Sequence, residues 1–108
     1  MKAQGGLRHG LPAHAIAEIR QVLARHPGVV RIVLYGLRAL GNYRTGSDID
    51  LCLDAPALSL AELLAIGTEI DELLLPWKVD LTLLQKIDNP ALLEHIRRVG
   101  VSFGDGGN

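Results

Sequence analysis

The chain has 108 residues, a formal net charge of −1 and a single cysteine. This length is enough for one domain with a hydrophobic core but not for two. With 48% hydrophobic residues, a packed domain is expected rather than disorder. The near-neutral charge argues against a broad basic face, so we expect no dedicated nucleic-acid binding. One cysteine excludes an internal disulfide framework and is typical of a reducing compartment.

No targeting or membrane segment is visible in the sequence. The first ten residues lack the apolar region of a signal peptide, and no apolar run approaches the roughly 18–20 residues of a membrane helix. We therefore expect a cytoplasmic protein that does not interact with membranes. We expect a flexible lead-in over residues 1–11, a single domain over 12–103 and a flexible tail over 104–108.

The first part of the domain is predicted to form a helix, a strand and a short second helix. Pro12 suits the first turn of the first helix, and the His-Pro-Gly sequence at 26–28 ends it. Residues 29–35 are short and rich in β-branched side chains, which predicts a buried strand. Gly36 breaks this strand, and residues 37–41 have room for only one or two helical turns.

The rest of the domain continues the alternation of strands and helices. A capping box of Ser59 and Glu62 begins the longest predicted helix, which ends before Pro76. Asn89 and Pro90 form the cap and first turn of a closing helix. From residue 49 on, we predict a strand, a helix, a strand, a helix and a short edge strand, at residues 49–53, 59–75, 79–84, 90–99 and 101–103. The fold class is α/β (α+β), with a small mixed sheet flanked by helices.

Three aspartates stand out within or beside the predicted strands. Asp48 and Asp50 are two residues apart, so in a strand they share one face while Ile49 between them points into the core. Two carboxylates this close repel each other unless a cation lies between them, and Mg²⁺ prefers oxygen ligands. Asp80 begins a later, otherwise apolar strand, where a charged side chain needs a reason.

The connections between the strands allow these acids to meet. If the first two strands are antiparallel neighbours, Gly36 at the end of the first lies beside Asp48 at the start of the second. A right-handed crossover through the long helix makes the third strand parallel to the second, which places Asp80 at the same edge. We therefore expect the glycine turn and three aspartates to converge there. The alternative is that the Asp-Ile-Asp sequence is only the polar face of an exposed strand.

The glycine turn itself is not a P-loop. Gly36 and Gly41 have the spacing of that motif's first half, but Asn42 and Tyr43 replace its lysine and hydroxyl residue. Instead, Gly36, the ten residues 38–47, Asp48-Ile49-Asp50 and then Asp80 resemble the nucleotidyltransferase superfamily related to DNA polymerase β. The resemblance is to its minimal (MNT) branch and covers about residues 12–103, including the closing helix E-H-I-R-R-V-G.

This resemblance implies a nucleotidyltransferase fold and a function for each site residue. Asp48 and Asp50 would bind the metal ions that carry a triphosphate, and Asp80 would complete a two-metal site and help activate the attacking hydroxyl. The metal would be Mg²⁺, with Mn²⁺ as a substitute. The residues expected to contact the nucleotide are Gly36, Leu37, Arg38, Arg44 and Ser47. For Arg38, a purely structural function is an equal alternative.

Leu37 departs from the family pattern, which usually has serine at this position. Losing one hydrogen bond to a charged group costs about 1.5–3 kcal/mol, and leucine also excludes water from a polar site. We therefore expect weakened metal–nucleotide binding and transfer that is slowed or absent.

The expected function is transfer of AMP from ATP, or of another NMP from its NTP, to a hydroxyl acceptor. The resemblance implies a helical HEPN-type partner protein and an antitoxin function in a toxin–antitoxin pair. The alternative is an inactive module that binds and occludes such a partner. A glycosyltransferase using Asp-x-Asp is a weak third hypothesis, because those domains are generally much longer. The acceptor, the base preference and the homo- or hetero-oligomeric state stay open.

The remaining chemically notable residues are given structural interpretations. The four histidines lack zinc-ligand spacing and are predicted to lie on the surface. Cys52 is predicted to be a small core residue. Trp77 is interpreted as a packing anchor, and Arg97 and Arg98 as solvated.

Overall fold

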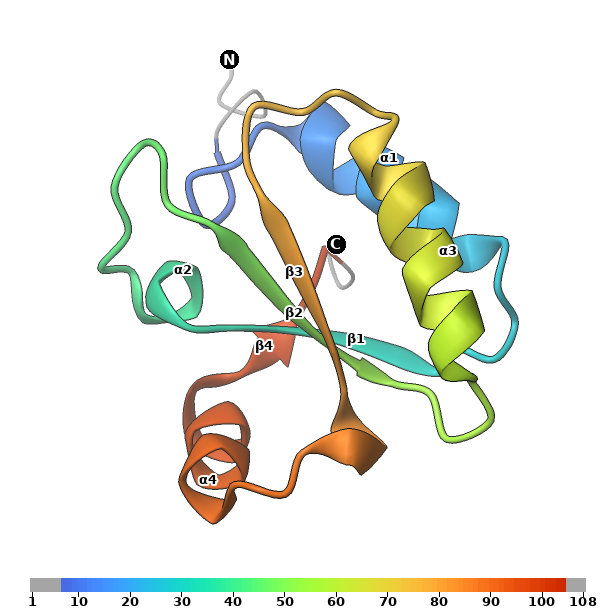
Figure 1. The fold of residues 1–108 in the computed structure, drawn as a ribbon. Helices are drawn as coiled ribbons and strands as arrows, with labels where there is room; N and C mark the ends of the chain where they lie inside the picture. Colours follow the sequence, from blue (N-terminus) through green and yellow to red (C-terminus); the bar gives the residue numbers. More distant parts are fainter. Residues whose placement is uncertain (1–6, 105–108) are drawn as a thin grey trace.

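The protein is described by a computed structural model that covers residues 7–104. Its elements, in chain order, are α1 (Ala13–Ala24), β1 (Arg31–Tyr35), α2 (Leu37–Leu40), β2 (Ile49–Asp54), α3 (Leu60–Asp71), β3 (Val79–Leu83), the 3₁₀ turn η2 (Leu84–Lys86), α4 (Pro90–Val99) and β4 (Val101–Ser102). Figure 1 shows them coloured along the chain. None of the helices within residues 7–104 combines the length and apolar character needed to cross a membrane.

The four strands form one mixed sheet in the order β3-β2-β1-β4. β1 is antiparallel to β2, with Leu34 opposite Leu51, and β2 is parallel to β3, with Leu51 opposite Leu81. The short strand β4 pairs with the free edge of β1. The predicted mixed sheet, its antiparallel first pair and the crossover to a parallel third strand are therefore confirmed.

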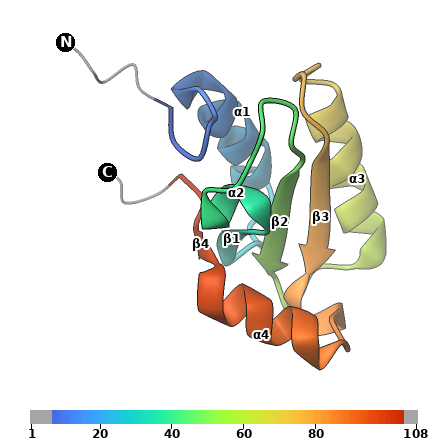
Figure 2. The ribbon, with the colours of Figure 1, turned by 90° about the vertical axis from the view of Figure 1, so that its left-hand side faces the viewer.

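Helices α1 and α3 lie side by side and cover one face of the sheet (Figure 1). The core fills the space between these two helices and the sheet. It includes Ile19 and Leu23 of α1, Leu34 of β1, Leu51 of β2 and Ile66 of α3. In Figure 2, α2 and α4 lie on the near side of the strands and α1 and α3 lie behind them. The second face of the sheet, covered only in part by α4, carries the polar side chains.

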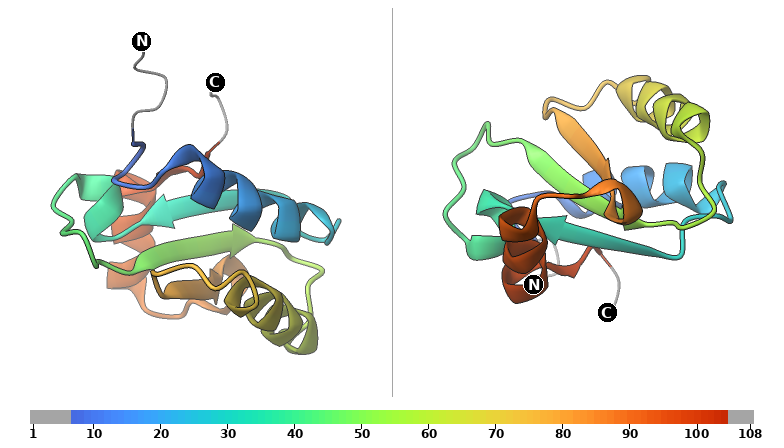
Figure 3. Two further views of the ribbon diagram at one scale, coloured as in Figure 1. Left: turned by 90° about the horizontal axis from the view of Figure 1, so that it is seen from above. Right: turned by 60° about the horizontal axis from the view of Figure 1, so that its bottom comes forward.

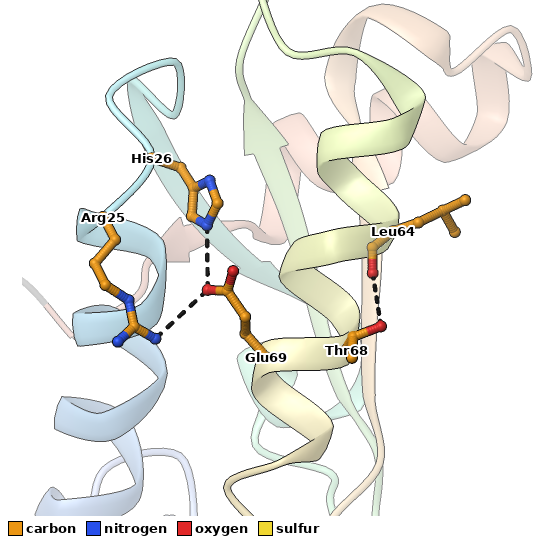
Figure 4. A network of polar contacts seen from close by, with 5 residues as sticks. All are labelled: Arg25, His26, Leu64, Thr68 and Glu69. Atoms are coloured by element: carbon orange, nitrogen blue, oxygen red, sulfur yellow. Dashed lines mark hydrogen bonds and ion pairs between the residues drawn. The ribbon is translucent and has the colours of Figure 1, made fainter.

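Glu69 of α3 connects the two helices of the core layer. Its carboxylate accepts a hydrogen bond from Arg25 at 3.4 Å and lies 3.2 Å from Nε2 of His26, in the turn that follows α1 (Figure 4). On the outer side of α3, the Thr68 hydroxyl donates to the Leu64 carbonyl one turn earlier. The contact at Glu69 holds the start of β1 in place relative to α3.

The predicted helix over 59–75 extends four residues past the end of α3 and includes its cap residue Ser59 at the start. α3 ends at Asp71, and Leu74 has a left-handed backbone with φ of 57°. The apolar pattern misled the prediction because Leu73 and Leu75 pack against the core from a turn and not from a helix. The residue before a proline disfavours helical backbone, which helps to end the helix early.

Other boundaries differ by a few residues. β2 begins at Ile49, so Asp48 precedes the strand and does not open it, and Leu84 belongs to η2 and not to β3. Most of the lead-in and tail (residues 1–6 and 105–108) lies outside the described residues. Residues 8–11 form a hydrogen-bonded turn with Leu11 fully buried, and the Gly104 carbonyl accepts a hydrogen bond from Arg20.

Candidate active site

The acids meet on the polar face of the sheet, at the end where β1 stops. Asp50 of β2 is the register partner of Asp80 of β3 on one side and of Tyr35 of β1 on the other. Register partners in neighbouring strands have side chains on the same face. The Ile49 and Leu51 side chains on either side of Asp50 are fully buried on the opposite face. The strand period and the crossover therefore bring two of the predicted acids together, as expected.

The two carboxylates repel each other. The pKa of Asp50 is raised, first by burial and then by the charges of Asp80 and Asp48, and the neighbouring His95 and Lys78 offset part of this shift. The Lys78 ammonium lies 3.6 Å from Oδ1 of Asp80, but its side chain is mostly exposed. The pair is thus a half-buried negative centre that a cation would stabilise.

Gly36 lies directly beside Asp50. Its φ of 77° is a conformation that side chains rarely adopt, and a Cβ built on it would collide with Oδ2 of Asp50. Its carbonyl accepts a hydrogen bond from Leu40, which starts α2. Only glycine allows β1 to end and turn this close to the carboxylate.

Arg38 supports the loop between α2 and β2, which projects beyond the end of the sheet in both views of Figure 3. Its side chain is 1% exposed, and the guanidinium donates to the carbonyl oxygens of Ser47, His9 and Thr45 at distances from 2.8 to 3.4 Å. Burial lowers the pKa of Arg38, and the charges of Tyr43 and Asp48 raise it. The guanidinium also lies 6.0 Å from the centroid of the Trp77 ring, and the Trp77 indole N–H donates to the Thr45 carbonyl at 3.1 Å. Of the two functions considered for Arg38, the contacts favour the structural one, and Trp77 lies where a packing anchor would.

The other predicted site residues lie in α2 and in the loop between α2 and β2. Leu37 is the first residue of α2, and 52% of its surface is exposed. Arg44 is exposed, and its backbone N–H donates to the Ser47 hydroxyl at 2.8 Å. Asp48 is exposed. Within residues 7–104 no group of three or more His, Cys, Asp or Glu side chains is placed to hold a metal ion. Asp48 directly precedes β2, and its charge contributes to the raised pKa of Asp50, so the membership of Asp48 in the expected trio stays a prediction.

Sequence reasoning missed three residues at this site. The Tyr35 hydroxyl lies 3.2 Å from the Thr82 hydroxyl, so its ring spans β2 beside the acids. His95 of α4, predicted to be a surface histidine, accepts a hydrogen bond from the Gly36 N–H. The alternation of side chains along β1 could have predicted Tyr35 on this face. The position of His95 could not be predicted in this way, because it depends on how α4 packs against the sheet.

A cavity of about 520 Å³ lies on the same face, between the sheet and α4. Its lining includes Cys52, the next residue after Asp50 on this face of β2, and Val33. Ile96 and Arg97 form part of the α4 side. The cavity lining also includes Arg31 and Asp54 at the far end of β1 and β2 from Gly36, and neither Asp50 nor Asp80 lines it.

Comparison with known proteins places this geometry in a family. Residues 17–103 match the family model described as "Polymerase beta, Nucleotidyltransferase". No curated protein matches the chain in a sequence search.

Several solved structures share the fold. A chain in the crystal structure of a toxin–antitoxin with AMP-PNP is 22% identical, with a TM-score of 0.67, over 82% of this chain and 71% of that chain. A chain in the MntA–HepT toxin–antitoxin structure is 21% identical, with a TM-score of 0.62, over 83% and 69%. One in a complex of tri-AMPylated Shewanella oneidensis HEPN toxin with MNT antitoxin is 20% identical, with a TM-score of 0.63, over 83% and 69%.

Proposed function

Since this chain belongs to the nucleotidyltransferase family related to polymerase β, we propose that it transfers AMP from ATP, or another NMP from its NTP, to a hydroxyl group of a partner protein. The observation that carries the proposal is the register pairing of Asp50 with Asp80 next to the Gly36 turn. This arrangement combines paired carboxylates with a backbone that a phosphate group can approach closely.

The acid pair has the chemistry that a divalent cation requires. Asp50 and Asp80 offer carboxylate oxygens, and their mutual repulsion, which contributes to the raised pKa of Asp50, would be relieved by Mg²⁺. Asp48, Asp50 and Asp80 would hold the metal ions, with Mn²⁺ as a substitute for Mg²⁺. When bound, the metal would neutralise the triphosphate and stabilise the leaving pyrophosphate.

The residues of the chain would orient both substrates. Gly36 would approach the phosphates, and the exposed Arg44 and the Ser47 hydroxyl would contact them. Asp80 would accept the proton of the attacking hydroxyl. Leu37 offers no hydrogen bond at the turn, so we expect weak nucleotide binding.

Equilibrium dialysis with ATP labelled at the α-phosphate tests this proposal. Wild type should bind ATP weakly with Mg²⁺ and not with EDTA. Leu37→Ser should bind on the order of tenfold more tightly, because it restores one hydrogen bond to a charged group. Asp50→Asn should bind none. If neither wild type nor Leu37→Ser binds the nucleotide, the proposed activity is wrong.

The partner is proposed to be a helical HEPN-type protein, with this chain acting as the antitoxin. The solved structures with this fold that contain a HEPN toxin and an MNT antitoxin support this part of the proposal. Co-expression with a small helical protein encoded beside this chain, followed by transfer of the α-phosphate label, would identify the acceptor. Label on this chain alone would contradict a partner acceptor.

The second candidate function is a non-catalytic module that occludes the same partner. It is favoured by two exposed leucines at the turn, Leu37 and Leu40, with 52% and 47% of their surface accessible. An Asp50→Asn, Asp80→Asn variant that still neutralises the partner would support occlusion. Loss of neutralisation in a variant that still binds the partner would support catalysis.

A further inference from the structure

His95 connects the closing helix α4 to the glycine turn. We propose that His95 is a positioning residue of this site, holding the Gly36 peptide against the acid pair by accepting its N–H. As it concerns nucleotide binding, this inference rests on the proposed function.

The hydrogen bond between Gly36 and His95 fixes which atom is the donor and which is the acceptor. The Gly36 nitrogen donates to Nε2 of His95 at 3.3 Å, so Nε2 is the unprotonated nitrogen and the ring proton lies on Nδ1. The Gly36 carbonyl accepts from Leu40 at 3.1 Å. Both polar groups of this residue are therefore held, which matters because a glycine at φ 77° has no side chain to restrict it.

The imidazole also packs beside the acids. It meets the Tyr35 ring edge-on, with centroids 6.2 Å apart and an interplanar angle of 80°. The Tyr35 hydroxyl in turn lies 3.2 Å from that of Thr82, so the contacts run from α4 across β1 to β3.

The position of α4 does not depend on this contact. Ile96 is 7% exposed, and Asn89 caps the helix with hydrogen bonds to the N–H groups of Ala91 and Leu92. Removing the imidazole nitrogen should therefore leave α4 in place and release the Gly36 peptide. An unpaired, partly buried N–H would then be free to turn away from the acids, and nucleotide affinity should fall on the order of tenfold.

Three variants test the inference. His95→Leu removes the acceptor, His95→Gln keeps a side-chain oxygen with similar reach, and Arg98→Leu alters an exposed residue of the same helix as the matched control. Two quantities are measured: hydrogen exchange of the Gly36 amide by NMR without ligand, and the Kd of Mg–ATP. We expect His95→Leu to lose amide protection and to bind about tenfold more weakly, and His95→Gln to stay within about threefold of wild type.

Two results would overturn the inference. One is Gly36 protection that is absent in wild type or unchanged in His95→Leu. The other is weaker binding that His95→Gln does not rescue, which would indicate only a structural effect of the ring. Absence of nucleotide binding in wild type and in Leu37→Ser would contradict the proposed function, and amide exchange alone would then decide whether His95 holds Gly36.

Discussion

Asp50 of β2 lies opposite Asp80 of β3 in the parallel pair, and Tyr35 of β1 lies opposite Asp50 on its other side. Three neighbouring strands thus contribute one residue each to a single row across the sheet. The row combines a phenol with two carboxylates at one level, directly beside the turn at Gly36. Since residues in a register row stay fixed relative to each other as long as the sheet is intact, the acid pair is preformed.

A preformed acid pair predicts stabilisation by Mg²⁺ without nucleotide. At a concentration about ten times Kd, binding adds about 1.4 kcal/mol to the free energy of unfolding, which raises the Tm of a domain of this size by about 5–8 °C. Thermal melts with Mg²⁺ and with EDTA measure this. Asp80→Asn should abolish the increase, and Asp71→Asn, at an exposed position of α3, should keep it. An increase that persists in Asp80→Asn would contradict a site at this pair.

The raised pKa of Asp50 predicts a specific pH dependence. Between the ordinary carboxyl pKa of about 4 and the raised value, the folded protein binds more protons than the unfolded chain, so stability falls as pH rises. Asp50→Asn removes this loss. Urea denaturation in EDTA should show the variant gaining stability over wild type through this range and keeping a constant advantage above it. A stability difference between the variant and wild type that stays constant through this pH range would contradict the raised pKa of Asp50.

The backbone at Gly36 predicts a graded series of glycine substitutions. Gly41→Ala should lower the free energy of unfolding by about 1–2 kcal/mol through the strain of its left-handed backbone alone, because no atom lies within 4 Å of the added Cβ. Gly36→Ala adds the close contact with Asp50 and a backbone, with φ of 77° and ψ of −154°, that side chains adopt even less readily than the left-handed helical one of Gly41, for a total of about 2–4 kcal/mol. Gly46→Ala meets neither cost and serves as the control. Equal losses of unfolding free energy at Gly36 and Gly41 would show that the carboxylate is not held against the turn.

Local patterns were enough to predict the sheet and the acid pair. The β-branched run before Gly36, the alternation around Asp50 and the helix between β2 and β3 determine strand directions and faces through rules that hold for any sheet. Those rules concern neighbours in sequence or register. They therefore placed Asp80 beside Asp50 without any knowledge of tertiary packing.

The parts that sequence could not predict depend on tertiary contacts. The apolar residues after Asp71 have the same pattern whether they pack from a helix or from a turn, so the end of α3 was placed four residues late. His95 reaches Gly36 only because α4 packs over that end of β1. The sequence suited Arg38 equally to binding a phosphate and to supporting the loop, and only the folded chain brings together the carbonyl groups of Ser47, Thr45 and His9 around it.

Arg38 carries the largest predicted stability effect of the loop. Arg38→Leu removes the side-chain donor to the Ser47 and His9 carbonyls and one of the two donors to the Thr45 carbonyl, at a cost of about 2–4 kcal/mol. Arg38→Lys should recover only part of this, because an ammonium cannot donate to all three in the planar geometry of a guanidinium. Urea denaturation measures the loss, and proteolysis within residues 42–48 reports the loop directly. Arg44→Leu, at an exposed position of the same loop, should stay within about 0.5 kcal/mol of wild type. If Arg38→Leu is as stable and as protease-resistant as Arg44→Leu, the loop is held by Trp77 and its own turns, and Arg38 would again become a candidate for binding the nucleotide.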